Sequence, residues 1–164
     1  MSKTETNLQN AFAGESQANR KHLAWSKKAE QEGFKQVAKL FKAVAEAETV
    51  HAHGHLKEMG GIKSTKENLE AALSGEVFEF EKMYPQMITE AEAEGNTAAL
   101  RTFTFANAVE KIHAELYKNA LANLGKNADA DYYVCSVCGH TIENEPTGDC
   151  PVCKSKKQAY KKID

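Results

Sequence analysis

The sequence predicts an all-α four-helix bundle, followed by a small domain of strands and loops that is held together by a bound metal. Residues 4 to about 124 are rich in Ala, Glu, Lys, Leu and Gln, which favour helices. Two copies of Glu-x-x-His lie in this stretch, and all four cysteines fall within the last 30 residues. A length of 164 residues suits one medium-sized domain and one small domain.

Glycines divide the helical stretch into four predicted helices, with turns at positions 33, 60, 61 and 95. The predicted helices cover residues 4–31, 34–59, 65–94 and 96–124. Ser64 or Thr65 provides an N-cap for the third helix. Pro85 lies inside this helix and has no amide hydrogen, so we expect a kink near Phe80–Met83.

The two Glu-x-x-His motifs are Glu48–His51 in the second predicted helix and Glu110–His113 in the fourth. Glu15 precedes the first motif by 33 residues and Glu76 precedes the second by 34, which indicates two related helical hairpins. Four helices that supply Glu, Glu-x-x-His, Glu and Glu-x-x-His form the ligand pattern of a carboxylate-bridged di-iron centre.

Helical periodicity places these polar groups on apolar faces, as where Phe41, Val44 and Glu48 share one face. Glutamate is almost never buried without a partner, and two divalent cations would neutralise such a cluster. Mixed Glu and His ligands favour iron or manganese. A single Glu-x-x-His is usually a solvated pair, and Glu79, one turn from Glu76, could simply be exposed. The candidate ligands in the helices are Glu15, Glu48, His51, Glu76, Glu79, Glu110 and His113.

The second metal motif consists of two close pairs of cysteines, Cys135, Cys138, Cys150 and Cys153. This spacing is typical of a four-thiolate metal site. Disulfide pairing is a weaker alternative, because Cys-x2-Cys loops are short and strained for structural bridges. The spacing does not choose between zinc and a single iron, and by itself it favours zinc.

The segments Gly75–Glu79, Met83–Pro85, Ala91–Asn96 and Glu110–Tyr117, together with the cysteine motif, resemble the rubrerythrin family. The resemblance covers essentially the whole chain. It implies a ferritin-like di-iron four-helix bundle, a linker, and a rubredoxin-like domain with one iron bound by four cysteines. The corresponding ranges are 1–124, 125–131 and 132–164. Zinc could occupy either site in the purified protein.

The resemblance also implies roles for the ligands. It assigns them in pairs: Glu48 and Glu110 as bridges between two irons, Glu15 and Glu79 on one iron, Glu76 and His113 on the other. His51 matches a histidine that replaces the Glu79-type ligand when the irons are reduced. Tyr84 matches a family tyrosine near the site, where it could donate a hydrogen bond or simply pack.

Two positions of the cysteine module are expected to affect its backbone conformation. Gly139 follows Cys138 and can take a positive φ, which turns backbone amides toward the sulfurs. Free-standing rubredoxins usually have glycine after the fourth cysteine, where this chain has Lys154. We expect a positive φ at Lys154 to cost about 1 kcal/mol, and its charge to raise the reduction potential of the site.

The activity that the resemblance implies is the reduction of hydrogen peroxide to water in defence against oxidative stress. The tetrathiolate iron would relay electrons from an external rubredoxin-type donor or an NAD(P)H-dependent reductase. The chain has no Gly-x-Gly-x-x-Gly, so the nicotinamide would bind the partner protein. Two alternatives are a ferritin-like ferroxidase or iron-handling protein, and a binding module that carries a zinc ribbon.

Charge and hydropathy exclude other classes. With 21 basic and 23 acidic residues the formal net charge is −2, which gives no support to nucleic-acid binding. No apolar run approaches the length of a signal sequence or a membrane span, so we expect a cytoplasmic protein.

The connection between the second and third helices predicts a homodimer. These helices must run parallel, and the segment from Met59 to Thr65 reaches only about 21 Å where about 32 Å must be crossed. We therefore expect a domain-swapped dimer, in which the first two helices pair with the last two of a second chain. We also expect the short linker 125–131 to keep each cysteine module away from its own di-iron site.

Overall fold

The computed structural model describes residues 2–163 and divides the chain into two compact units, Met1–Lys63 and Ser64–Asp164. The first unit is a helical hairpin. The second unit contains three longer helical segments and a small antiparallel sheet. Each unit is described by itself.

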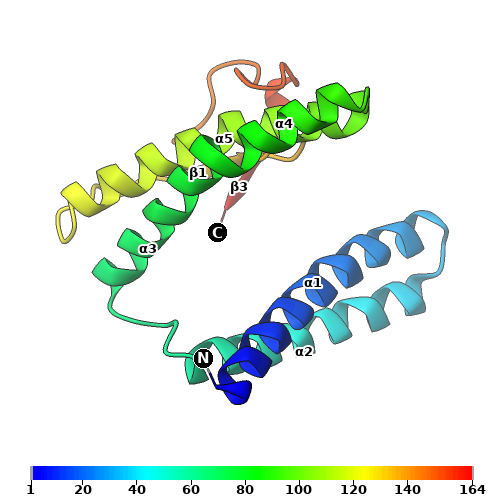
Figure 1. Ribbon diagram of the computed structural model, residues 1–164. Coiled ribbons are helices and arrows are strands. Elements are labelled where there is room, and N and C mark those ends of the chain that lie inside the picture. The colour runs from blue at the N-terminus through cyan, green and yellow to red at the C-terminus, as the bar shows by residue number, and fades with distance from the viewer. Residues whose placement is uncertain (1, 164) are drawn as a thin grey trace. The chain divides into compact units, whose positions relative to one another are not determined.

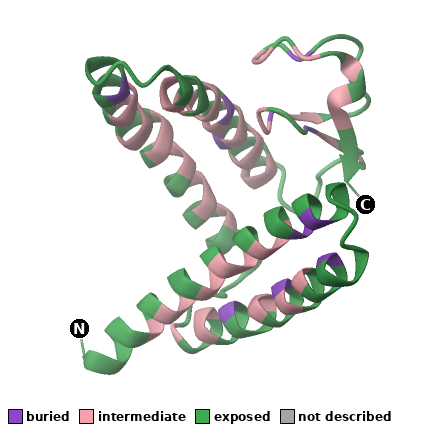
Figure 2. Cartoon of the chain, turned by 90° about the vertical axis from the view of Figure 1, so that its right-hand side faces the viewer, coloured by how far each residue is buried: buried purple, intermediate pink, exposed green. Residues whose placement is uncertain are grey.

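The first unit is built from helices α1 (Lys3–Gln31) and α2 (Lys35–Glu58), which lie side by side (Figure 1). Ser2 begins α1 with a capping box, in which its hydroxyl accepts a hydrogen bond from the amide of Glu5. Buried alanines line the contact between the helices and allow a close approach (Figure 2). The hydroxyl of Ser26 donates to the carbonyl of Ala38 at 2.9 Å and ties the helices together near the turn.

The second unit begins with α3 (Thr65–Phe78), which continues through a π-helical segment, η1 (Glu79–Met83), into α4 (Tyr84–Ala93). Helix α5 (Thr97–Ala122) returns antiparallel and packs on both α3 and α4. Ser64 caps α3 by accepting from the amide of Glu67, and the Asn96 side chain caps α5. The four predicted helical spans are therefore confirmed, with ends that differ by one or two residues.

The π-helical segment lies where the sequence predicts a kink. The amide of Tyr84 donates to the carbonyl of Glu79, five residues back, and widens this turn. Pro85 has no amide hydrogen to donate to the carbonyl four residues before it, which favours such an irregular turn. The ribbon changes direction between α3 and α4 (Figure 1). The widened turn carries Glu79, one of the predicted ligands.

The cysteine module follows α5 and contains the sheet. Its strands are β1 (Tyr132–Cys135), β2 (Thr141–Glu143) and β3 (Tyr160–Ile163), in the order β2-β1-β3, with both pairs antiparallel. A short 3₁₀ helix, η2 (Lys157–Ala159), leads into β3. The predicted fold class, helices followed by a small metal-binding domain with strands, is confirmed.

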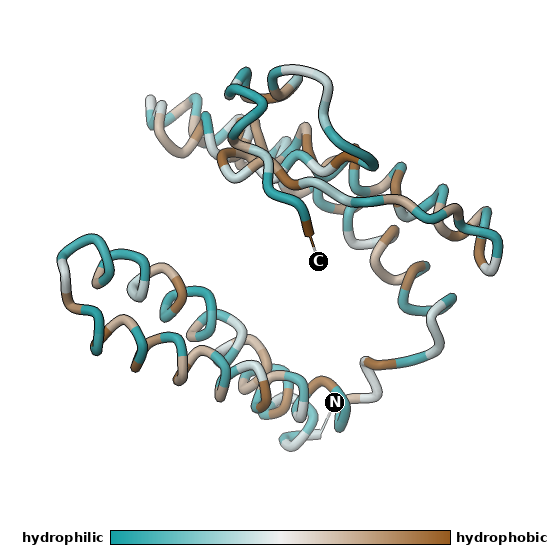
Figure 3. Tube along the Cα trace, turned by 180° about the vertical axis from the view of Figure 1, so that it is seen from behind, coloured by the Kyte–Doolittle hydropathy of each residue, from teal (hydrophilic) through white to brown (hydrophobic). Residues whose placement is uncertain are grey.

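The helices are amphipathic, and apolar positions alternate with hydrophilic ones along them (Figure 3). Several large apolar residues remain about half exposed or more: Trp25, Leu40, Val50 and Phe78 expose 48%, 62%, 65% and 58% of their surface. Apolar area is therefore left for further packing. Within the described residues, no helix is long and apolar enough to cross a membrane.

Candidate metal centres

The second unit holds a cluster of two carboxylates and an imidazole. Glu76 comes from α3, and Glu110 and His113 come from adjacent turns of α5. The Nδ1 atom of His113 lies 2.7 Å from Oε2 of Glu110 and 3.8 Å from Oε1 of Glu76. One ligand atom from each residue lies within 4.8 Å of the others. Ligands on opposite sides of one ion stand about 4 Å apart, so the three side chains fit a shared cation.

The electrostatics of this cluster also favour a cation. Burial, together with the nearby carboxylates of Glu110 and Glu79, raises the pKa of Glu76 to about 7. Burial likewise raises the pKa of Glu79, helped by Glu110 and opposed by His113. The charge of Glu110 thus opposes ionisation of both Glu76 and Glu79, a costly arrangement that a bound cation would relieve.

Tyr84 lies beside the carboxylates at the start of α4. Burial raises the pKa of its hydroxyl, and the charges of Glu110, Glu79 and Glu76 add to this effect. Its ring packs against Phe103, with the ring centroids 6.4 Å apart. Tyr84 therefore keeps its proton and can donate a hydrogen bond near the cluster.

The first unit holds a matching cluster of Glu15, Glu48 and His51, again with ligand atoms within 4.8 Å of one another. Nδ1 of His51 lies 3.0 Å from Oε2 of Glu48, and this hydrogen bond is the main reason that the pKa of Glu48 is lowered. The His51 side chain is 56% exposed, whereas that of His113 is 25% exposed. The two hairpins thus repeat one arrangement, with a freer histidine in the first.

The structure brings six of the seven predicted helical ligands into two half-sites, one in each unit. Glu79 is the exception, because its carboxylate is not part of the compact group around His113, although it interacts with Glu110. Each half-site supplies two carboxylates and one imidazole, which is half of the ligand set of a carboxylate-bridged di-iron centre.

The four cysteines gather at the end of the sheet, and one Sγ atom from each lies within 4.8 Å of the others. Cys135 and Cys153 are separated by 3.7 Å between Sγ atoms, and Cys138 and Cys150 by 3.6 Å. Both values are close to about 3.8 Å, the edge of a tetrahedron with metal–sulfur bonds of about 2.3 Å. The four thiols are free and fit one tetrahedral ion.

The backbone conformation next to these sulfurs is the one that the sequence predicts. Gly139 has φ 83° and Lys154 has φ 62°, which confirms a positive φ at both positions. Although burial raises the pKa of the Cys153 thiol, hydrogen bonds with the hydroxyl and amide of Ser155 lower it to about 6. The surroundings of Cys153 therefore favour a thiolate, whereas burial raises the pKa of the Cys138 thiol.

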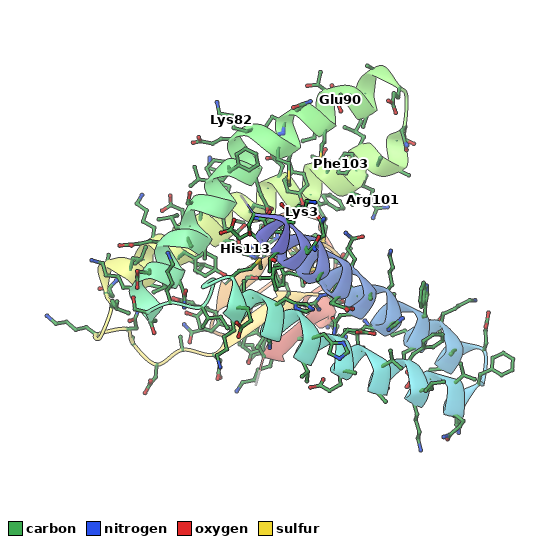
Figure 4. All side chains as sticks on the ribbon, turned by 60° about the horizontal axis from the view of Figure 1, so that its bottom comes forward. Lys3, Lys82, Glu90, Arg101, Phe103 and His113 are labelled. Carbon is green, nitrogen blue, oxygen red and sulfur yellow. The ribbon has the colours of Figure 1, made fainter. Side chains whose placement is uncertain are left out.

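The cysteine module packs on α5 of its own chain. A Cβ atom at Gly139 would lie 3.8 Å from Cγ1 of Val109, and Thr141 Oγ1 lies 2.9 Å from Nε2 of His113. The side chain of His113 is labelled on α5 in Figure 4. The expectation that the linker keeps the module away from its own helical ligands is wrong for this half-site. The linker does not need to be long, because the module folds back along the helix that precedes it.

Sequence reasoning missed two polar groups of this module. Thr141 contacts the ligand histidine, and Nδ1 of His140 lies 2.6 Å from the hydroxyl of Tyr160. His140 is only 6% exposed, although it stands two residues after the turn at residues 136–138. In the sequence, Thr141 stands out only as a β-branched residue two positions after Gly139.

Comparison with known proteins agrees with both metal centres. A family model described as rubrerythrin matches residues 6–121, and one described as the rubredoxin-like domain of rubrerythrin matches residues 133–161. The chain belongs to the rubrerythrin family. This membership confirms the resemblance, the candidate di-iron site and the four-cysteine rubredoxin-like site.

Relatives with the same organisation are similar over nearly the whole chain. Rubrerythrin-2 of Clostridium acetobutylicum is 35% identical, with 93% of this chain and 92% of the relative covered. Nigerythrin of Nitratidesulfovibrio vulgaris is 34% identical, with 96% and 85% covered. Among solved structures, a fully reduced, all-ferrous state of nigerythrin has a TM-score of 0.61 and 31% identity, with 99% of this chain and 88% of that chain covered. Rubrerythrin-family membership identifies the chain as an oxidoreductase.

Proposed function

We propose that this rubrerythrin-family protein reduces hydrogen peroxide to water in defence against oxidative stress: H₂O₂ + 2 e⁻ + 2 H⁺ → 2 H₂O. The observation that carries the proposal is the combination of two Glu/His half-sites with a tetrathiolate site in one chain. A ferroxidase needs only the half-sites, whereas a peroxidase that is re-reduced after each turnover needs a relay for electrons.

The proposed ligands would hold two irons. The family pattern implies that Glu48 and Glu110 would bridge them, that Glu15 and Glu79 would bind one iron, and that Glu76 and His113 would bind the other. When bound, two ferrous ions supply one electron each and polarise the peroxide oxygens. The His51 side chain is 56% exposed and, among the described residues of the first unit, hydrogen-bonds only to Glu48, in keeping with a ligand that changes place with Glu79 on reduction.

One of the two protons can come from the chain itself, and solvent supplies the other. Tyr84 lies in the field of Glu79 and Glu110 and keeps its proton, so its hydroxyl can donate to an oxygen held beside these carboxylates. Tyr84 would return to its protonated form by taking a proton from solvent.

Electrons enter through the cysteine module. The four cysteines would hold an iron that can take up and release one electron at a time, which suits a relay from an external rubredoxin-type donor or NAD(P)H-dependent reductase to the helical site. Two close pairs of cysteines that bind metal rather than form disulfides are typical of a reducing compartment, and we propose a cytoplasmic location.

The protein is proposed to act as a domain-swapped homodimer. Helix α2 continues to Glu58 and α3 begins at Thr65 with a complete capping box at Ser64. Neither helix is shortened where it would need to be for the connection to cross the bundle within one chain. In a swapped dimer, residues 1–124 would still form the ferritin-like bundle that the sequence predicts, from two chains.

Peroxide turnover by anaerobically purified protein tests the proposal. We expect peroxide consumption with reduced rubredoxin or with NADH and its reductase, and a loss of at least about 100-fold in E48A and E110A. E115Q is the matched control, because Glu115 lies on α5 but is exposed and paired with Lys118. Full turnover in E48A and E110A would contradict the proposal. Faster oxidation of ferrous iron by oxygen than reduction of peroxide would favour the ferroxidase alternative.

A further inference from the structure

The start of β2 and the residue pair before it contact α5 at two points. A Cβ atom at Gly139, just before β2, would lie 3.8 Å from Cγ1 of Val109, and Thr141, the first residue of β2, contacts His113. Val109 and His113 stand four residues apart and so lie on one face of α5. Val109 is only 2% exposed, so this contact is well packed.

The hydroxyl of Thr141 has a single hydrogen to donate. Its Oγ1 lies 3.0 Å from the carbonyl oxygen of Gly139, which can only accept. If the hydrogen pointed elsewhere, two oxygen lone pairs would face each other at hydrogen-bond distance. The Thr141 hydroxyl therefore donates to Gly139 and must accept at its 2.9 Å contact with Nε2 of His113. This contact requires a hydrogen on Nε2.

We propose that Thr141 is a positioning residue, which holds the hydrogen of His113 on Nε2 and leaves Nδ1 to bind metal. The inference rests on the proposed function, in that His113 is taken as a ligand. Nδ1 is the nitrogen that faces Glu110 and Glu76, at 2.7 and 3.8 Å, so the fixed tautomer directs the lone pair to the carboxylate cluster. Partners of this kind orient a ligand histidine and strengthen its bond to the metal.

The first unit provides an internal contrast. His51 makes the same contact through Nδ1, with Glu48, but within the described residues its Nε2 has no hydrogen-bond partner like Thr141. Two histidines of the same motif thus differ in the restraint on Nε2 as well as in exposure. The restraint comes from the loop that also carries Cys138, so the ligand His113 and the tetrathiolate loop are joined by the hydrogen bonds His113–Thr141–Gly139.

Nuclear magnetic resonance of the zinc-loaded full-length protein tests the inference without reference to turnover. With ¹⁵N-labelled histidine, we expect a one-bond N–H signal at Nε2 of His113, protected from exchange with water, and no hydrogen on Nδ1. T141V keeps the shape but removes the acceptor, so this signal should be lost to exchange. Zinc affinity at the helical site should fall about 10- to 100-fold. T141S restores the hydroxyl and should recover both.

T104V is the matched control, because Thr104 is an exposed residue of α5 itself and its hydroxyl donates to the carbonyl of Leu100 in the same helix. It should leave the His113 signal and the zinc affinity unchanged. A hydrogen on Nδ1, wild-type affinity in T141V, or failure of T141S to rescue would each overturn the inference. Wild-type protein that binds no zinc at the helical ligands would overturn both this inference and the ligand assignment, whereas absence of peroxide turnover with an intact His113 signal would count against the proposed function alone.

Discussion

The carboxylate ligands should lower the stability of the metal-free protein and raise the stability of the metal-loaded protein. Glu76 is mostly buried beside Glu110 and Glu79, so an amide at position 76 removes a costly like charge. We expect E76Q to raise the stability of the chelator-treated protein by about 1–2 kcal/mol and to lower that of the metal-loaded protein. Thermal unfolding with and without metal measures both.

E115Q again provides the control for this experiment, since its exposed carboxylate interacts with Lys118 alone. It should change neither form by more than about 0.5 kcal/mol. Destabilisation of the metal-free protein by E76Q would mean that the carboxylate serves the fold rather than a cation.

A second prediction at the residue scale concerns Lys154, whose φ of 62° is unusual for a residue with a side chain. K154G should relieve the strain and stabilise the module by up to about 1 kcal/mol. K154M keeps the strain but removes the charge. If the ammonium group raises the reduction potential of the tetrathiolate site, both variants should lower that potential, and only K154G should resist denaturation better. Redox titration and urea unfolding of each variant separate the two effects, and an unchanged potential in both would exclude an electrostatic role.

The ligand residues could be predicted from the sequence because their chemistry conflicts with their position. A glutamate on the apolar face of a helix, as at Glu48 or Glu110, needs a cation, and the helical period alone identifies the face. The role of Thr141 could not be predicted in this way. A threonine near a turn is ordinary, and its importance depends on which helix the cysteine module packs against.

At the scale of elements, glycines and caps were sufficient to place the helices, but the form of the irregular turn was not evident. Pro85 predicts a disturbance of the third helix, which could be a kink, a 3₁₀ turn or a π-helical turn. The structure has the π-helical form, with Glu79 at its first position and Tyr84 directly after it. A widened turn adds a residue relative to an α-helix, so it changes which side chains face the cluster.

We therefore expect P85A to separate stability from metal binding. Alanine restores the amide hydrogen and removes the clash of the ring, which favours a regular α-helix and should raise the thermal stability of the metal-free protein. A regular helix would turn Glu79 away from its place beside Glu110 and so reduce iron content. Circular dichroism and metal analysis measure the two effects. Equal iron content in P85A and wild type would show that the widened turn does not depend on the proline.

At the scale of the whole molecule, the sequence limits distances but does not show which surfaces fit. The length of the Met59–Thr65 connection limits how far α3 can start from α2, and the observed helix ends leave that limit in place. The same kind of reasoning failed for the linker 125–131, because a short linker allows a module to fold back on the preceding helix. The contact of Gly139 with Val109 depends on complementary shape, which linker length does not reveal.

The swapped dimer makes a prediction that an unswapped dimer cannot satisfy. Consider one chain with E15A and E48A, which destroys the half-site of the first unit, and a second chain with E76A and E110A, which destroys the other. Each variant alone should be inactive. In a mixed dimer with swapped hairpins, the intact first unit of one chain meets the intact second unit of the other, so one complete site forms and about half of the wild-type peroxide turnover returns. Unswapped bundles would leave a destroyed half-site in every bundle.

Co-expression with two different affinity tags isolates the mixed dimer, and light scattering confirms its mass. A mixed dimer of correct mass with no turnover and no recovered iron would rule out the swap, because a swapped dimer of these two chains always contains one undamaged site.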